Sequence, residues 1–361
     1  MTRSLKLQNV PSQLLFAIVA MITLVAGLHP KEFRFRNSVE RTEDGPGLNF
    51  GKYGVAYTDP ILNVTTVEQL NLNGFELALS LGGETDQDQR GFAFIAQIYS
   101  GDDATQFIVG RYADHLIVMY GDDYRHRFKR PRISTVLTKS QRADGVTIVI
   151  RSDQSGSSIE LNGVIVAQND GVRFQIPHSP KDTRIVLGNS VYGAHSWEGE
   201  LREVALSKAG RMNDPLLSYS MANIFDEAVP NSGSVVGDLR IPRRFPVVER
   251  NFLAWPFNHQ FETSSSFFKD VLLNLFGFVP FGFVVGLLVP YRSKIKLIGL
   301  SILGSAAMSL CIEYAQTGMP SRSSSLLDLL LNIAGGFLGV ILLVALIRYP
   351  KRNLRSGQIH G

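Results

Sequence analysis

The fold is decided by two similar stretches of sequence, DVLLNLFG at residues 270–277 and DLLLNIAG at residues 328–335. Each begins with an aspartate, has an asparagine four residues later, and opens an apolar run close to the roughly 20 residues that a helix needs to cross a bilayer. Residues four apart lie on the same face of a helix, so each asparagine shares a face with its aspartate. We interpret the two stretches as one motif used twice, in two membrane-spanning helices that run in the same direction.

Apolar runs divide the whole chain. It has 361 residues, of which 45% are hydrophobic and only 19% charged, and a charged fraction below the usual ~25% makes an ordinary soluble enzyme less favoured. Runs at about residues 14–28, 267–289, 297–315 and 326–347 predict four spans. The first run has a second interpretation as a cleaved signal peptide, because Arg3 and Lys6 precede it and small residues follow it.

Basic residues predict the topology. They are concentrated in the loop between the second and third spans and in the C-terminal tail: Arg292, Lys294, Lys296, Arg348, Lys351, Arg352 and Arg355. The loop before the fourth span has only Arg322, so the tail is expected in the cytoplasm. The first span disagrees, because basic residues follow it at positions 31, 34 and 36. The later spans have the larger bias, so we expect the N-terminus inside and the long segment after the first span outside.

That outside segment has the pattern of an all-β domain. Short runs rich in β-branched and aromatic residues are separated by glycine and aspartate, at residues 75–79, 92–98, 106–110, 115–120, 146–150 and 184–187. Asn162-Gly163 lies between two apolar runs and suits a type I′ hairpin turn. Many short strands with frequent turns predict a jelly-roll sandwich.

The predicted fold class is therefore mixed, an all-β jelly-roll sandwich inserted into a four-span α-helical membrane bundle. The predicted parts are an N-terminal transmembrane helix (1–30), a linker (31–47), an extracytoplasmic β-sandwich (48–210), an extended juxtamembrane linker (211–266), a three-helix transmembrane region (267–348) and a basic cytoplasmic tail (349–361). Residues 240–246 mix arginine, phenylalanine and helix-breaking proline. With Trp255 they fit an interfacial belt that touches lipid phosphates, or else a solvated linker.

Polar residues of the C-terminal spans are predicted at one depth on the outer side. Asp270, Glu313, Arg322 and Asp328 are the ionisable members. A charge near the bilayer costs a few kcal/mol unless it is paired or hydrated, so these groups should face the bundle interior. One arginine for three carboxyl groups suggests a missing basic ligand or cation. The candidate ligand cluster comprises Asp270, Asn274, Glu313, Gln316, Arg322, Asp328 and Asn332.

Each member also has a structural interpretation. Asp328 follows Ser325 with the spacing of a capping box, and Lys269 can neutralise its neighbour Asp270. The two asparagine amides can serve as contacts between helices. Glu313 is the hardest to explain structurally, because an acidic group at the C-terminal end of a helix opposes the helix dipole.

Other site chemistry has little support. Two Gly-Asp-Asp turns contain Asp102, Asp103, Asp122 and Asp123, which suit calcium but are more simply turn residues; no other cofactor or metal is expected. The one cysteine, Cys311, excludes an internal disulfide, and a net charge of +4 argues against a nucleic-acid partner. No nucleotide loop and no common hydrolase motif occurs, so the sequence identifies no catalytic residue.

Two resemblances follow from these motifs. Trp197, Gly199, Leu201 and Val204 form a Trp-x-Gly-x-Leu-x-x-Val strand that resembles laminin-G-like, concanavalin-A-like sandwiches, many of which bind carbohydrate. The C-terminal spans resemble the VanZ-like family of bacterial membrane proteins, whose eponym is associated with teicoplanin resistance. Three motifs carry this resemblance: Asp270-x-x-x-Asn274 with Pro280-x-Gly282, Glu313-x-x-Gln316 with Arg322, and Asp328-x-x-x-Asn332.

The second resemblance implies a multi-pass protein of a bacterial cytoplasmic membrane and no defined reaction. We expect the outer cluster to bind an envelope lipid or lipid-linked glycan precursor, and one form of this hypothesis has the cluster also modify it. The sandwich is expected to recognise glycan. The alternative is a non-catalytic membrane-anchored receptor or scaffold for carbohydrate or protein.

Overall fold

The structure is a computed structural model that describes residues 11–29, 35–42, 45–59, 62–84, 91–101, 106–121, 131–177, 183–246, 252–255, 265–289, 293–320 and 322–348. It has two compact units. A β-sandwich comprises Arg34–Val248, and a helical unit comprises Met1–Phe33 with Glu249–Gly361.

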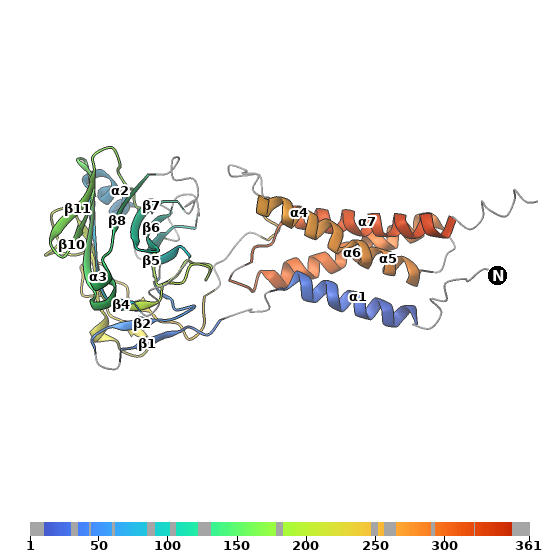
Figure 1. Cartoon of the computed structure of the whole chain (residues 1–361), viewed down its shortest axis with the longest axis horizontal. Coiled ribbons are helices and arrows are strands. Elements are labelled where there is room, and N and C mark those ends of the chain that lie inside the picture. Colours follow the sequence, from blue (N-terminus) through green and yellow to red (C-terminus); the bar gives the residue numbers. More distant parts are fainter. Residues whose placement is uncertain are drawn as a thin grey trace, which may run out of the picture. The chain divides into compact units, whose positions relative to one another are not determined.

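The sandwich consists of two antiparallel sheets (Figure 1). The first has the order β1 (Val39–Arg41), β2 (Leu48–Phe50), β13 (Gly199–Lys208), β4 (Phe75–Glu84), β9 (Val146–Asp153), β10 (Gly156–Leu161) and β11 (Val164–Asn169), and β14 (Leu217–Ser220) also pairs with β13. The second has the order β15 (Ala228–Val229), β16 (Leu239–Arg240), β3 (Ala56–Thr58), β12 (Arg184–Leu187), β5 (Ala93–Tyr99), β6 (Phe107–Tyr112), β7 (His115–Tyr120) and β8 (Arg132–Val136). Two short helices, α2 (Val64–Asn73) and α3 (Lys139–Asp144), and a 3₁₀ turn at Met221–Asn223 complete it. The predicted sandwich is confirmed.

The core explains the motif around Trp197. The indole is fully buried, and its Nε1 donates a hydrogen bond to Glu84 Oε1 at 3.2 Å. A Cβ at Gly199 would lie 2.6 Å from the indole ring, so only glycine lets β13 begin beside the tryptophan. The predicted hairpin turn is also confirmed, because Asn162 and Gly163 have φ of 49° and 84° and connect Leu161 to its partner Val164.

The sandwich is larger than residues 48–210. Strands β1, β14, β15 and β16 come from the two stretches predicted as linkers, and Tyr219 and Leu239 in the second stretch are fully buried. The interpretation of residues 211–248 as an extended linker is therefore wrong. Strands of two to four residues are too short to show a hydrophobic period, so the pattern along the chain did not reveal them.

The helical unit contains α1 (Ser12–Gly27), α4 (Ser265–Gly277), α5 (Val279–Leu288), α6 (Lys294–Gln316) and α7 (Leu326–Arg348). Three stretches of the described residues are long and apolar enough to cross a membrane, namely Phe267–Leu288, Lys294–Gln316 and Leu326–Ile347. Helix α1 is apolar but has only 16 residues, so the count of four spans is not confirmed. Pro280 lies in the first turn of α5, where the first stretch is interrupted between α4 and α5.

Glycines let the helix backbones approach closely. A Cβ at Gly335 would lie 2.0 Å from the carbonyl oxygen of Leu275 in α4, and one at Gly339 would lie 2.1 Å from that of Val279 in α5. Such distances leave no room for any side chain, so α7 packs directly against the backbone of α4 and α5. Helix α1 packs against α5, where the Phe16 and Phe281 rings lie 6.0 Å apart.

Candidate functional site: a polar cluster at one end of the helical unit

Four helix ends meet at one end of the helical unit. Helices α1 and α6 end there, and α4 and α7 begin there (Figure 1). The arrangement brings the ends of α4, α6 and α7, with the loop that contains Arg322, to one level. The convergence inferred from the repeated motif is thus present in the structure, while a ligand at that place stays a prediction.

Glu313 is buried, with 1% of its surface exposed. Its Oε2 accepts a hydrogen bond of 2.8 Å from the backbone N–H of Ser325, and the Ser324 side chain also bonds the carboxyl group. Ser325 directly precedes α7, so the carboxyl lies at the positive N-terminal end of that helix. The unfavourable position at the end of α6 is therefore offset by a favourable position at the start of α7.

Asp328 joins the two copies of the motif. Its backbone N–H donates to Ser325 Oγ at 3.3 Å, which matches the spacing of the predicted cap. Its carboxyl group is hydrogen-bonded by the Asn274 side chain from α4, and it interacts electrostatically with Asp270 and Arg322. The aspartate of one copy thus contacts the asparagine of the other. Asp270 itself is exposed on α4.

Asn332 lies one turn deeper in α7 and contacts α6. Its Nδ2 donates to Ser309 Oγ at 2.9 Å, and both residues are buried. Ser305 lies one turn before Ser309 in α6 and faces Gly336, where a Cβ would lie 2.0 Å from the serine oxygen. At this depth the polar groups are packed tightly between helices, so a role in helix packing explains Asn332 well. Ser305 and Ser309 are four residues apart, a spacing visible in the sequence, but neither serine was a predicted member of the site.

Gln316 and Arg322 contact the end of α1. Gln316 Nε2 donates to the carbonyl oxygen of Gly27 at 2.9 Å, and the Arg322 guanidinium donates to the carbonyl oxygen of His29. The last carbonyl groups of a helix have no partner within the helix, so these side chains satisfy the end of α1. Arg322 also interacts electrostatically with Glu313. These contacts with α1 were not predicted, because nothing in the sequence showed which backbone groups would lie nearby.

A short segment before α4 completes the cluster. Leu253 N–H donates to Ser324 Oγ at 3.1 Å, Ala254 N–H donates to the Ser324 carbonyl at 3.1 Å, and the Ala254 carbonyl accepts from Leu326 N–H at 3.1 Å. This pairing holds the Ser324 hydroxyl beside Glu313. Such an isolated backbone bridge has no signature in the sequence.

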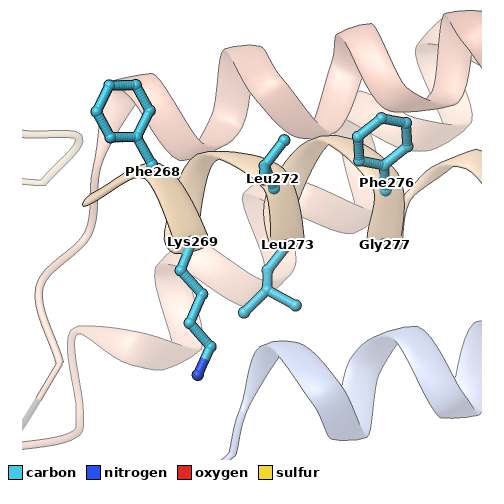
Figure 2. Close-up of a pocket in the computed structure, with 6 residues that line it drawn as sticks. All are labelled: Phe268, Lys269, Leu272, Leu273, Phe276 and Gly277. Carbon is cyan, nitrogen blue, oxygen red and sulfur yellow. The ribbon is translucent and has the colours of Figure 1, made fainter. Parts of the chain in front are cut away.

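The outward face of α4 is hollowed next to Asp270. Figure 2 shows Lys269 and Leu273 pointing to one side of the helix and Phe268, Leu272 and Phe276 to the other. The hollow has a volume of about 550 Å³, and its lining is otherwise apolar. A smaller hollow of about 330 Å³ lies on α1 beside Met21, Val25 and His29. Both surfaces suit hydrocarbon chains.

The cluster offers hydrogen-bonding groups and no metal-binding set among the described residues. Within the described ranges no three His, Cys, Asp or Glu residues could hold a metal ion. The carboxyl, amide and guanidinium groups can instead bond hydroxyl, amine or phosphate groups. The four aspartates considered for calcium, Asp102, Asp103, Asp122 and Asp123, lie outside the described residues.

Residues 234–348 match the VanZ/LLP1 family model, which confirms the resemblance for the C-terminal region. This region and the three apolar helices identify a membrane protein with a VanZ-like part. No curated protein matches the chain by sequence.

Solved structures resemble the fold. The binding domain of botulinum neurotoxin DC in complex with SialylT has 12% identity and a TM-score of 0.34, over 47% of this chain and 41% of that chain. The Ruminococcus gnavus sialidase carbohydrate-binding module CBM40, bound to α2,3-sialyllactose, has 10% identity and a TM-score of 0.32, over 45% and 90%. A Streptococcus pneumoniae sialidase has 12% identity and a TM-score of 0.30, over 43% and 26%. The chain thus covers less than half of the toxin domain that it matches.

Proposed function

We propose that this membrane protein acts at the outer face of a bacterial cytoplasmic membrane, where the polar cluster binds the head group of an envelope lipid or lipid-linked glycan precursor. The observation that supports the proposal is the burial of Glu313 in a cluster with Asp328, Asp270 and a single arginine. Carboxyl groups at a membrane boundary are costly and mark functional sites more often than packing sites. The apolar hollow on α4, next to Asp270, would accommodate the hydrocarbon chains of the same ligand.

For the sandwich we propose glycan recognition. Tyr57 and Tyr192 are half-buried beside a cluster on the second sheet, and a partly exposed aromatic ring is a surface on which a sugar ring can stack. The neighbouring Tyr53 ring is stacked on Phe35 at 4.2 Å. Binding of the detergent-solubilised full chain to an array of envelope glycans tests this part. Loss of binding in Tyr57→Ala and Tyr192→Ala, with unchanged binding in a control such as Tyr112→Ala on β6, is the expected result. Equal binding by all variants would contradict it.

Glu313→Gln separates the ligand role from the structural role. The glutamine amide keeps an oxygen that can accept from Ser325 N–H, so the cap of α7 persists while the negative charge is lost. Glu313→Ala loses both. Native mass spectrometry of the solubilised protein should find a lipid bound to the wild type and lost in Glu313→Gln. Retention of the lipid in the glutamine variant and loss only in the alanine variant would assign Glu313 to structure alone.

The alternative is a non-catalytic anchor for a receptor sandwich. It is favoured by the bonds of Glu313 to Ser325, of Asn332 to Ser309 and of Gln316 to Gly27, all of which hold the helices together. Replacing the helical unit by one unrelated span should then preserve function in cells. Loss of function with normal amounts of the protein at the membrane would exclude the anchor and support the ligand site. No catalytic residue is assigned in either proposal.

A further inference from the structure

The basic segment at residues 240–246 is part of the sandwich. Ile241 and Phe245 are buried in it, and the Phe245 N–H donates to the carbonyl oxygen of Phe35 at 2.9 Å. The Asn37 N–H donates in turn to the carbonyl oxygen of Arg243 at 3.1 Å. The interpretation of this segment as a solvated linker is therefore wrong, and its outward side chains are held on a fixed surface.

The pairing places two arginines side by side. Arg36 and Arg244 face each other as an antiparallel bridge, with the hydrogen bonds on the flanking residues, and both are exposed. In that geometry the two Cα atoms are about 4.5 Å apart and the side chains leave the sheet on the same side. Like charges directly opposite are destabilising unless an anion lies between or above them.

Two neighbouring arginines have carboxylate partners. Arg240 forms an ion pair with Asp59, and Arg243 Nε donates to Glu227 Oε1 at 2.7 Å. Among the described residues, no carboxylate forms an ion pair with Arg36 or Arg244. The pair is therefore a fixed positive site without a counter-ion from the described part of the chain, and phosphate is an anion whose geometry suits two guanidinium groups.

An exposed aromatic ring lies next to the basic segment. Phe225 is 80% exposed at a two-residue turn closed by hydrogen bonds with Ala228. The turn residues Asp226 and Glu227 have φ of 47° and 67°, the left-handed conformation that a two-residue type I′ hairpin turn uses at both central positions. The bond between Glu227 and Arg243 joins this turn to the basic segment.

We propose that Arg36, Arg244 and Phe225 form a docking surface for the phosphate head groups of an anionic lipid bilayer. Chain length favours a lipid surface as the partner, because Arg36 follows the last residue of α1, Gly27, by nine residues. Nine residues reach at most about 30 Å, so the pair is always within reach of the membrane that the helices enter. Arginine with an aromatic ring is the composition typical of membrane interfaces. This surface is independent of the polar cluster and of the ligand proposed for it.

The test uses the full chain in lipid nanodiscs with a fluorophore at Lys52→Cys, in a Cys311→Ser background. Lys52 is exposed and its carbonyl accepts a hydrogen bond from Ser38, two residues from Arg36. Quenching by nitroxide-labelled lipid is expected in discs that contain phosphatidylglycerol and not in discs of phosphatidylcholine. The double variant Arg36→Gln with Arg244→Gln should weaken docking about 30-fold, since each basic residue at an anionic surface contributes about a factor of five.

Arg211→Gln with Lys139→Gln is the matched control, because it removes the same charge from exposed positions on other elements. It should leave the quenching unchanged, and Phe225→Ser should reduce it. Equal quenching in both kinds of disc, or unchanged quenching in the Arg36 and Arg244 variant, would overturn the proposal. Protection of the fluorophore by soluble polyphosphate, without any dependence on phosphatidylglycerol, would show an anion site that is not a lipid surface.

Discussion

Glu84 is a carboxylate on which two buried groups depend, so Glu84→Ala is expected to destabilise the sandwich strongly. Its Oε1 lies 3.0 Å from Arg111 Nε and accepts the hydrogen bond of Trp197 Nε1 at 3.2 Å. The side chains of Arg111 and Glu84 are only 1% and 3% exposed. Removing one partner of a buried ion pair costs about 3–5 kcal/mol, because the other charge is left uncompensated. In a unit of this size that corresponds to a fall in Tm of about 6–20 °C.

The assay is thermal unfolding of the solubilised full chain in a Trp255→Phe background, followed by the fluorescence of the buried Trp197, the other of the two tryptophans. Glu84→Gln keeps a hydrogen-bond acceptor for Trp197, so its Tm should fall less than that of Glu84→Ala. The double variant Glu84→Leu with Arg111→Met removes both charges and should recover much of the loss, since apolar residues of similar volume often replace a buried pair at little cost. A loss below about 1 kcal/mol for Glu84→Ala, or a double variant as unstable as the sum of the two single variants, would refute the reasoning.

Three further predictions concern packing and pH. Gly335→Ala should destabilise the helical unit by about 1–3 kcal/mol, seen as loss of a monodisperse peak in detergent. Gly277→Ala is the control, because a Cβ there meets nothing within 4 Å, and it should keep the peak. Equal behaviour of the two variants would contradict the close packing of α7. Ser309→Ala should cost about 0.6 kcal/mol and no more than about 1.7, measured by unfolding in detergent, and a larger loss would mean that Asn332 has a further role. Burial lowers the pKa of His195 below 6.5, so the contribution of the neutral imidazole to stability is complete above pH 6.5. That contribution is lost as the pH falls from 6.5 toward the folded pKa, by up to about 1.4 kcal/mol per pH unit. His195→Phe should flatten the pH dependence of Tm, and an unchanged pH profile would exclude His195 as the source of that dependence.

The sequence predicted those parts of the fold that have a period. The apolar runs gave the three long spans, and the alternation in strands such as β9 with the Asn162-Gly163 turn gave the sandwich. The short strands were not predicted, because β15 and β16 have only two residues each. Their stability comes from the pairing of β15 with β16 and of β16 with β3. The limits of the sandwich therefore could not be read from composition.

The meeting of the helix ends that carry the polar residues was predicted, whereas most contacts of these residues were not. Helical spacing placed Asp270 and Asp328 at one level and each asparagine one turn deeper, and in the structure the Asn274 side chain hydrogen-bonds Asp328. The partner of Glu313 could not be predicted, because it is a backbone N–H at the start of another helix. Arg322 was selected as a counter-ion, and its bond to the His29 carbonyl depends on where α1 ends. Contacts with backbone groups depend on the tertiary packing and carry no residue signature.

The central claim is that the outer cluster binds a lipid or lipid-linked head group through the Glu313 carboxyl. The most direct measurement is the fraction of solubilised protein that carries a bound lipid in native mass spectra, for the wild type and for Glu313→Gln at equal thermal stability. The account predicts a specific lipid on the wild type and at least a tenfold loss of occupancy in the variant, which is about 1.4 kcal/mol of binding. Equal occupancy in the two proteins, or no specific lipid on either, would contradict it.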